Sequence, residues 1–429
     1  MNLLWRSCGR RRDRHLCNDA FSLLSGPPLP TAPARSSLNT PRIFAIAFLS
    51  LVSSLLAQFQ PPAAYYDQAI GKTGAPLKAA LHAAIKVHTV LPYTSTSTDT
   101  WDALKFIDED PNNSNNVVLI YSGFTDLKIN QDNGTTGTWN REHLWPQSYG
   151  LVALDPNSRA KTDIFNLRPI DASVNSSRGN KYFDWSTAPV SIHPEAPTST
   201  YDTDSWEPRD TDKGRIARSM FYMAVRYEGT DADAPDLELS DSPNPALYRF
   251  GKLSTFTAWN RDFPVTDSER QRNQRIYTDY QHNRNPFIDH PEYADMVFSG
   301  TSPAQAWKNI RFSSIELGNP LQSGDLADPD GDQQVNLLEY AFNRNPKKVD
   351  PSPAVTSSFA SNYVYLSFPK NRNATDVVIS CESSGNLQSW DPVASDIVSS
   401  TVTDFETEQV TLRFPSTTFP FFVRLKVVR

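Results

Sequence analysis

The segment Thr138–Gly150, TWNREHLWPQSYG, places a carboxylate and an imidazole next to each other at Glu142 and His143. Hydrolysis of a phosphate ester needs an activated water, a cation near the phosphate oxygens and stabilisation of the leaving oxyanion. A neutral imidazole accepts a proton near physiological pH, so His143 is a candidate general base. Glu142 is a hard oxygen ligand suited to Mg²⁺ or Ca²⁺. Adjacent strand residues point to opposite faces, so both side chains can serve one site only if the chain bends here, and Pro146 fits such a break.

A second segment, residues 163–184 with the sequence DIFNLRPIDASVNSSRGNKYFD, offers further polar groups. Its amide side chains can supply neutral oxygen ligands, and the basic side chains in and just before it can contact phosphate; they are Asn166, Asn175, Asn180, Arg159, Arg168, Arg178 and Lys181. Residues 141–184 contain six basic and five acidic residues, so this stretch is slightly positive within an acidic chain. Such a local excess suits phosphate binding.

Taken alone, a Glu-His pair is not specific, because a surface pair with satisfied hydrogen bonds is the common alternative. Together, however, the two segments strongly resemble the bacterial endonuclease I family, nucleases of the ββα-metal class. The resemblance covers about residues 64–298 and includes YYDQAIGKTGAPLKAALHAAIKVHTVL, DEDPNNSNNVVLIYSG, RIARSMFYMAVRY and HNRNPFIDHPE. Several long motifs in the same order make a chance match very improbable.

The resemblance implies a role for individual residues. It places the general base at His143 and the ligands of a catalytic Mg²⁺ (or Ca²⁺ or Mn²⁺) at Glu142 and at Asn166, on the helix of the metal finger. It also implies a phosphate-stabilising arginine, for which Arg159 and Arg178 are the two candidates. Many relatives carry a His near this Asn, whereas this chain has Phe165, so the surroundings of the ligands are expected to differ.

A separate acidic loop, DPDGDQQVNLLE at residues 328–339, spaces oxygen ligands as an EF-hand does. The loop positions 1, 3, 5, 7, 9 and 12 fall on Asp328, Asp330, Asp332, Gln334 (through its backbone carbonyl), Asn336 and Glu339. The glycine expected at position 6 is replaced by Gln333. The loop resembles the calcium loops of dockerins and thrombospondin type 3 repeats. We therefore expect a structural Ca²⁺ here; a solvated acidic turn is the alternative.

The elements that must position these groups belong to an α+β fold. Apolar spacing predicts helices within 63–91, 100–109, 213–227 and 269–282, and a continuous apolar run predicts a buried strand over 117–121. We expect a ββα-metal nuclease core with surrounding helices over 58–300, and a linker with the calcium loop over 301–353, in which 303–317 form a linker or short strand. Short alternating runs predict a small all-β sandwich over 354–429.

The N-terminal residues 1–57 read as a targeting segment, because Arg42 precedes an apolar run and a small residue, Ala57. The run of roughly 14 residues is shorter than the ~20 that a membrane span needs, although an N-terminal anchor is the alternative. Without this segment the chain holds 34 Lys and Arg against 46 Asp and Glu, a net charge of −12, unlike a protein that coats nucleic acid. Cys381 is then the lone cysteine, so no intrachain disulfide can form.

The sequence thus predicts a secreted, periplasmic or cell-surface nuclease, without a transmembrane domain in the mature chain. Its expected partner is DNA, and RNA is a further candidate substrate; no stable protein partner is implied. Two alternatives remain open: a calcium-dependent surface-binding protein with an inactive nuclease-like domain, and a phosphodiesterase with another substrate.

Overall fold

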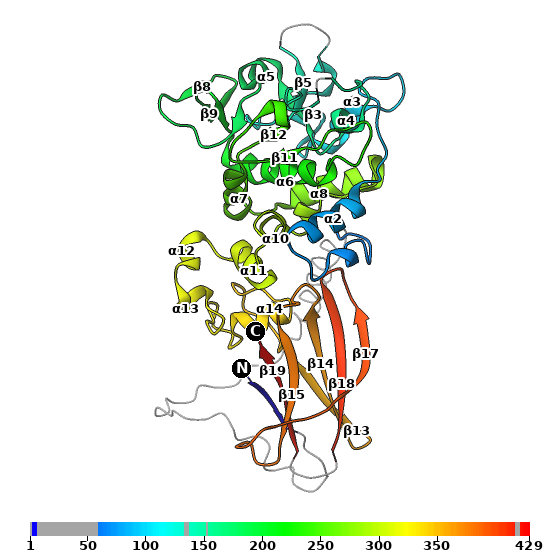
Figure 1. Cartoon of the computed structure of the whole chain (residues 1–429), viewed down its shortest axis with the longest axis vertical. Coiled ribbons are helices and arrows are strands. Elements are labelled where there is room, and N and C mark those ends of the chain that lie inside the picture. Colours follow the sequence, from blue (N-terminus) through cyan, green and yellow to red (C-terminus); the bar gives the residue numbers. More distant parts are fainter. Residues whose placement is uncertain (1, 7–58, 133–136, 152, 417–420) are drawn as a thin grey trace, which may run out of the picture.

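The computed structural model describes residues 2–6, 59–132, 137–151, 153–416 and 421–429 (Figure 1). The predicted targeting segment lies outside the described residues except for β1 (Asn2–Arg6), which pairs antiparallel with the last strand, β19 (Phe422–Val428). Three regions follow one another along the long axis: a helical region (59–300), a connecting region (301–353) and a β region (354–429) (Figure 1). Within the described residues, no helix combines the length and apolar character needed to span a bilayer.

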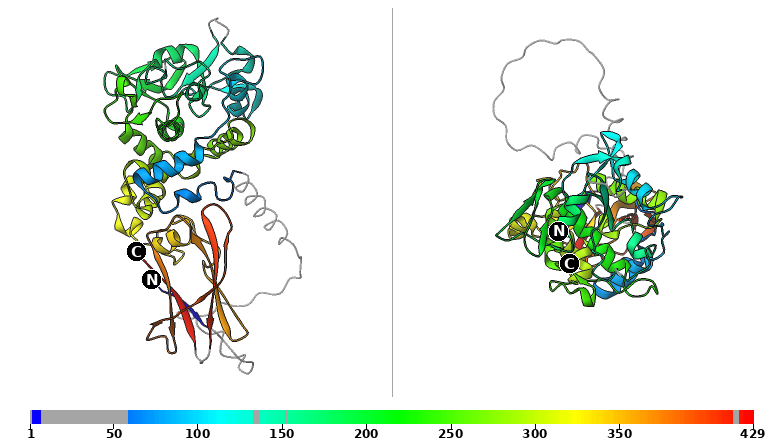
Figure 2. Two further views of the ribbon diagram at one scale, coloured as in Figure 1. Left: turned by 45° about the vertical axis from the view of Figure 1, so that its right-hand side comes forward. Right: turned by 90° about the horizontal axis from the view of Figure 1, so that it is seen from above.

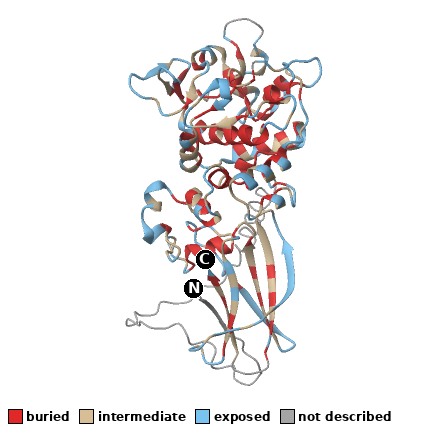
Figure 3. Ribbon diagram, viewed as in Figure 1, coloured by how far each residue is buried: buried red, intermediate tan, exposed pale blue. Residues whose placement is uncertain are grey.

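Helix α6 (Asp210–Arg226) forms the centre of the helical region and is buried on nearly all sides (Figure 3). The predicted helix over 213–227 is confirmed, although it begins three residues earlier. Charges on such a helix must be paired, and Arg218 meets Glu269 through two hydrogen bonds of 2.7 Å. The helices α2 (Gly74–Ile85), α7 (Leu253–Asp262) and α9 (Pro286–Asp289) pack against α6.

The other three predicted helices are present, with α2 inside the predicted 63–91, and one predicted strand differs. Helix α3 (Thr100–Ile107) starts at a capping box formed by Asp99, and α8 (Asp267–Arg275) continues into a π-helical turn, η4 (Ile276–Tyr280). Strand β3 (Asn113–Val118) covers only the start of the apolar run predicted as a strand. The following residues are buried without joining the ladder, because Tyr121 adopts a φ of +70° and turns the chain away.

The arrangement that carries the candidate site is a pair of strands followed directly by a helix. Strand β5 (Trp139–His143) pairs antiparallel with β6 (Leu167–Asp171), with Glu142 opposite Arg168. Helix α5 (Ala172–Arg178) starts immediately after β6, where the Asp171 carboxylate accepts the backbone N–H groups of Ser173 and Val174. Glu142 and His143 are the last two residues of β5 and both pair with β6, so the predicted break in the strand lies after His143 and not between the two residues.

Smaller elements complete the helical region. They are β2 (Glu109–Asp110), β4 (Thr125–Leu127), α4 (Arg159–Thr162), β7 (Tyr182–Phe183), β8 (Ser191–His193), β9 (Ala196–Tyr201), β10 (Ser205–Glu207), β11 (Glu238–Leu239), β12 (Arg249–Phe250), α10 (Tyr293–Phe298) and the 3₁₀ turns η1 (Asp67–Ala69), η2 (Lys128–Asn130) and η3 (Pro245–Leu247).

The connecting region is helical, so the prediction of a linker or short strand over 303–317 is wrong. It contains α11 (Pro303–Arg311), α12 (Ser314–Leu317), α13 (Pro320–Ser323) and α14 (Asn336–Ala341). Ser302 and Ser313 cap the first two helices through their side chains, a local signal that apolar spacing alone does not reveal. Trp307 of α11 packs against Tyr340 of α14, with ring centroids 5.3 Å apart.

The β region holds two antiparallel sheets whose long strands run roughly along the molecule (Figure 2). One has the order β13 (Thr356–Ala360), β14 (Tyr363–Asn371), β18 (Thr407–Pro415), β17 (Asp396–Val402); the other has the order β1, β19, β15 (Val378–Ser384), β16 (Asp391–Pro392). Alternate residues of β14, β18 and β19 are buried in one shared core. Leu337, Leu338 and Phe342, on and just after α14, belong to the same core.

Candidate active site

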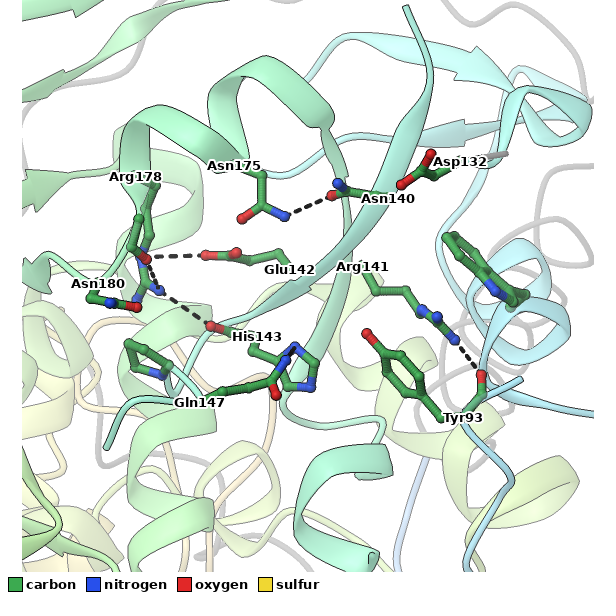
Figure 4. A pocket seen from close by; sticks show the side chains of 13 residues that line it. Tyr93, Asp132, Asn140, Arg141, Glu142, His143, Gln147, Asn175, Arg178 and Asn180 are labelled. Carbon is green, nitrogen blue, oxygen red and sulfur yellow. Dashed lines mark hydrogen bonds and ion pairs between the residues drawn. The ribbon is translucent and has the colours of Figure 1, made fainter. Parts of the chain in front are cut away.

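A pocket of about 340 Å³ opens beside the end of β5 and the helix α5 (Figure 4). Glu142, His143 and Arg178 all line it, so the structure brings together three residues that the sequence singled out. The remaining lining residues come from β5, α3, α5 and the loops around them; they are Tyr93, Trp101, Asp132, Asn140, Arg141, Pro146, Gln147, Asn175, Gly179 and Asn180.

His143 is held in one tautomer by the backbone. Its Nε2 lies 3.0 Å from the carbonyl oxygen of Lys161, which can only accept, so Nε2 carries the hydrogen. The other nitrogen, Nδ1, therefore has a free lone pair when the ring is neutral, and Gln147 Nε2 donates to it over 3.4 Å. Burial lowers the pKa of His143 to about 4, and the charges of Arg141, Lys161 and Arg178 act in the same direction. The ring is thus neutral at physiological pH and presents Nδ1 as a base.

Glu142 is 2% exposed and receives two contacts on the same carboxylate oxygen. The Tyr121 hydroxyl donates to Oε1 over 2.7 Å, and Arg178 Nε lies 3.4 Å from Oε1. Burial raises the pKa of Glu142, an effect that Arg178 and the Tyr121 hydrogen bond oppose. Because both partners use Oε1, Oε2 is the oxygen available to a ligand in the pocket. The carboxylate is therefore oriented as a metal ligand would need to be.

Tyr121 is a site residue that sequence reasoning missed. Its side chain is buried, and burial together with the nearby Glu142 raises the pKa of Tyr121 well above its usual value, so the hydroxyl stays a donor. Asp212 accepts its backbone N–H at 3.0 Å, and Ser199 Oγ donates to its carbonyl at 2.8 Å, which together hold its left-handed backbone. The apolar run VVLIY indicates a core strand, and nothing in that pattern distinguishes this tyrosine from its neighbours.

Arg178 is 1% exposed and fixes the backbone around the Glu-His pair. Its NH2 donates to the carbonyl of Leu144 over 2.7 Å and its NH1 to the carbonyl of Gly179 over 3.1 Å. NH1 also donates to the carbonyl of His143 over 3.3 Å (Figure 4). These contacts, with the Glu142 ion pair, occupy the guanidinium. Arg178 therefore lies in the pocket wall but acts as a positioning residue, rather than as the phosphate ligand that the family resemblance suggested.

Three other arginines, Arg159, Arg168 and Arg141, lie in or near this part of the chain, and of these Arg141 lines the pocket. Arg159 does not line the pocket: it pairs with Asp233 at 2.8 Å and lies 3.6 Å from Asp231, so the structure does not bring this candidate for phosphate binding to the Glu-His pair. Arg168 is buried against Asp108 at 3.0 Å. Arg141 does line the pocket, where its guanidinium is sandwiched between Tyr93 and Trp101, 3.4 and 4.0 Å from their ring centroids.

Asn166 lies outside the pocket, in the turn before β6, so its predicted place on the helix of the finger is wrong. It precedes β6, is fully buried, and its Oδ1 accepts the Trp145 backbone N–H at 2.7 Å while Nδ2 donates to the Trp145 carbonyl at 3.4 Å. Both ends of the amide are thus used to join two loops. Phe165 is likewise buried and packs on Tyr222, so it does not alter the pocket.

Asn175, on α5, occupies the position expected of the helix ligand. It lines the pocket, and its Nδ2 donates to Asn140 Oδ1 over 2.7 Å, which leaves its own Oδ1 for a cation (Figure 4). The three-residue spacing of Asn175 and Arg178 places them on one face of a helix, a signal available in the sequence once 172–178 are read as helical. Glu142 Oε2 and Asn175 Oδ1 are both hard oxygen donors, so the residues present fit a divalent cation.

The acidic loop forms a second cluster, in the connecting region. Asp328, Asp330 and Asp332 bring one carboxylate oxygen each within 4.8 Å of one another, and so do Asp332, Glu339 and Asp350. Asp350, which lies outside the twelve-residue loop, was not among the predicted ligands. Burial, with the neighbouring carboxylates, raises the pKa of Glu339 to about 8. Gln334 and Asn336 lie in the same loop with their side chains buried.

Comparison with known proteins finds a matching family and several relatives. The family model for endonuclease I matches residues 73–292. An extracellular ribonuclease of Bacillus amyloliquefaciens is 51% identical over 237 residues, which are 54% of this chain and 78% of that protein. An extracellular ribonuclease of Bacillus subtilis (strain 168) is 46% identical over 284 residues, 64% of this chain and 95% of that protein. An extracellular deoxyribonuclease of Aeromonas hydrophila is 28% identical over 137 residues, 32% of this chain and 52% of that protein. With its pocket built around Glu142 and His143, the chain belongs to the endonuclease I family and is a nuclease.

Proposed function

We propose that this protein is a secreted, metal-dependent endonuclease that hydrolyses phosphodiester bonds of RNA, with DNA as a second substrate. The observation that carries the mechanism is the fixed tautomer of His143, whose Nδ1 faces the same pocket as the Glu142 carboxylate. RNA comes first because the relatives named ribonucleases are 46–51% identical, whereas those named deoxyribonucleases are 28% identical. Secretion is supported by the extracellular names of these relatives and by the N-terminal segment.

In this mechanism, His143 Nδ1 removes a proton from a water molecule, whose oxygen forms a bond to phosphorus while the bond to the leaving oxygen breaks. Glu142 and Asn175 hold a divalent cation, with Mg²⁺ as the first candidate. The bound cation would neutralise charge on the phosphate and on the leaving oxygen. Arg178 and Tyr121 keep the Glu142 carboxylate in place, and the Lys161 carbonyl keeps His143 in the reactive tautomer.

The test is cleavage of a long RNA and of a supercoiled plasmid by the purified mature chain, across a Mg²⁺ titration and with EDTA. His143→Ala is expected to slow cleavage by about 10²- to 10⁴-fold, the usual contribution of a general base. His193→Ala, on strand β8 outside the pocket, serves as the matched control and should cleave like the wild type. Wild-type rates in His143→Ala would refute the mechanism, and no cleavage by the wild type under any metal would favour the surface-binding alternative.

A further inference from the structure

The acidic loop contains a buried carboxylate that has no counter-charge of its own. Glu339 is 0% exposed, and neither Oε1 nor Oε2 has a hydrogen-bond partner among the residues that the structure describes. A buried ionised carboxylate without a partner is strongly unfavourable. The oxygens of Glu339 lie within 4.8 Å of carboxylate oxygens of Asp332 and Asp350, so its nearest neighbours add to this cost.

Other oxygens in the same loop are left unpaired in the same way. Asp330 Oδ2, Gln334 Oε1 and Asn336 Oδ1 are buried and have no hydrogen-bond partner within the described parts of the chain. Asn336 uses only its nitrogen, which donates to the carbonyls of Gln322 and Gly324 at 2.7 and 2.8 Å. The one ion pair recorded for the five carboxylates of the cluster, within the described residues, joins Arg344 to Asp350 at 2.7 Å. Asp328 and Asp332 accept backbone N–H groups on both carboxylate oxygens, so the oxygens left without a donor among the described residues are those of Glu339 and the three just named.

We propose that this cluster binds a structural Ca²⁺ and that Asp350, outside the EF-hand-like loop, is one of its ligands. The donor set is made entirely of oxygens, most of them carboxylate, and is too large for the six-coordinate, water-rich shell that Mg²⁺ prefers. It contains no imidazole or thiolate that would favour Zn²⁺. The loop reaches the required turn despite lacking glycine at position 6, because Gln333 itself adopts a φ of +73°.

The position of the ion gives it a structural role between two parts of the chain. Glu339 lies on α14, whose residues Leu337 and Leu338 are part of the core of the β region. Asp350 lies just before β13, and its backbone N–H donates to Asp332 Oδ2 over 3.1 Å. An ion held by Asp332, Glu339 and Asp350 therefore links α14 to the entry of the β region. Binding is coupled to the order of residues 325–350 and is independent of the nuclease pocket.

The test is calorimetric titration of the metal-free full chain with CaCl₂, carried out in a Glu142→Gln background so that the pocket carboxylate is neutral. We expect one site with a dissociation constant of about 10⁻⁵ to 10⁻³ M. Adding Glu339→Gln should weaken binding by at least about 100-fold, and Asp350→Asn should also weaken it. Glu316→Gln is the matched control, because Glu316 is in the same region but pairs with Lys347 at 2.6 Å.

Hydrogen exchange followed by mass spectrometry provides a local readout in the otherwise unsubstituted chain. Ca²⁺ should slow exchange in peptides from 325–350, and Glu339→Gln should abolish this response. Cleavage by Glu339→Gln in Mg²⁺ should match that of the wild type. The proposal is overturned if the Glu142→Gln chain takes up no Ca²⁺, or if Glu339→Gln retains the calcium-dependent protection; neither result bears on the nuclease mechanism.

Discussion

Replacing Asn175 with alanine separates the ligand that the structure indicates from the one that the motif suggested. The change removes one neutral oxygen from the pocket and one hydrogen bond, from Nδ2 to Asn140 Oδ1. Losing even an indirect ligand contact commonly costs 10- to 100-fold in metal affinity, so the Mg²⁺ concentration for half-maximal cleavage should rise by at least about that factor. Stability should change by no more than about 1 kcal/mol, because the side chain is only half-buried and its partner can turn to water.

Replacing Asn166 with alanine should have the opposite signature. Asn166 is 0% exposed, and its removal leaves the buried Trp145 N–H without the acceptor it now meets at 2.7 Å. An unsatisfied buried donor costs about 1–3 kcal/mol. For a region of this size, each kcal/mol lowers the melting temperature by about 2–4 °C, so a decrease of about 2–12 °C is expected. The folded fraction should keep the wild-type Mg²⁺ requirement.

The assay is a Mg²⁺ titration of RNA cleavage at a temperature where both variants are folded, together with calorimetric melting of each. Expressing rates per folded molecule removes the stability effect from the comparison. If Asn166→Ala raises the Mg²⁺ requirement while Asn175→Ala leaves it unchanged, the assignment of the ligand to α5 is refuted.

Three further outcomes follow from the same contacts. Arg178→Lys should lower kcat and the melting temperature while changing KM little, because the donors of Arg178 point to protein carbonyls; a large rise in KM alone would instead mark it as a phosphate ligand. Arg159→Ala should cleave at close to the wild-type rate and lose less than about 1 kcal/mol of stability, since its partners Asp231 and Asp233 form a partly exposed pair; a hundredfold loss of activity would contradict this. Burial lowers the pKa of His88 to about 4, so protonation favours the unfolded chain. The contribution of His88 to the free energy of unfolding should be complete above about pH 6.5 and fall by up to about 3 kcal/mol as the pH drops toward 4. In denaturant titrations, the free energy of unfolding of His88→Asn should therefore fall less steeply with decreasing pH than that of the wild type.

The parts of the site that the sequence predicts are those that lie next to each other in the chain. Glu142 and His143 share one short motif, and both line the pocket. Their supports come from elsewhere: Tyr121 from a buried apolar run, and the Lys161 carbonyl from the short helix α4. A pattern of side chains does not predict which backbone carbonyl will accept a hydrogen bond from the histidine. Asn175 shows a different limit. Asn166 and Asn175 are the same residue type in one motif, and they differ in that Asn175 lies on a helix whereas Asn166 lies in a turn.

The same distinction explains the fold. Helix α6 was predictable because its apolar spacing persists over four turns. The helices of 303–317 were missed although α11 buries Ala304, Ala306 and Trp307 on one face, because that face is short and the side-chain caps Ser302 and Ser313 that mark the helix starts were not read as such. Asp350 was missed for a related reason. It stands eleven residues beyond Glu339 and joins the cluster only once α14 has turned the chain back.

The two candidate metal sites use similar ligands but differ in how their charge is balanced. In the pocket, Arg178 lies 3.4 Å from the Glu142 carboxylate and Tyr121 donates to it, so the carboxylate is compensated without a metal. In the connecting region, neither oxygen of Glu339 has a partner among the described residues. Removing the metal should therefore have opposite consequences at the two sites. At the pocket, a chelator should abolish cleavage and change the stability of the helical region little. At the acidic loop, the loss of the ion should destabilise residues 325–350, and this loss alone should not affect catalysis. Adding back Mg²⁺ alone should restore cleavage while leaving the loop unprotected, whereas Ca²⁺ should protect the loop even in a chain whose pocket carries Glu142→Gln.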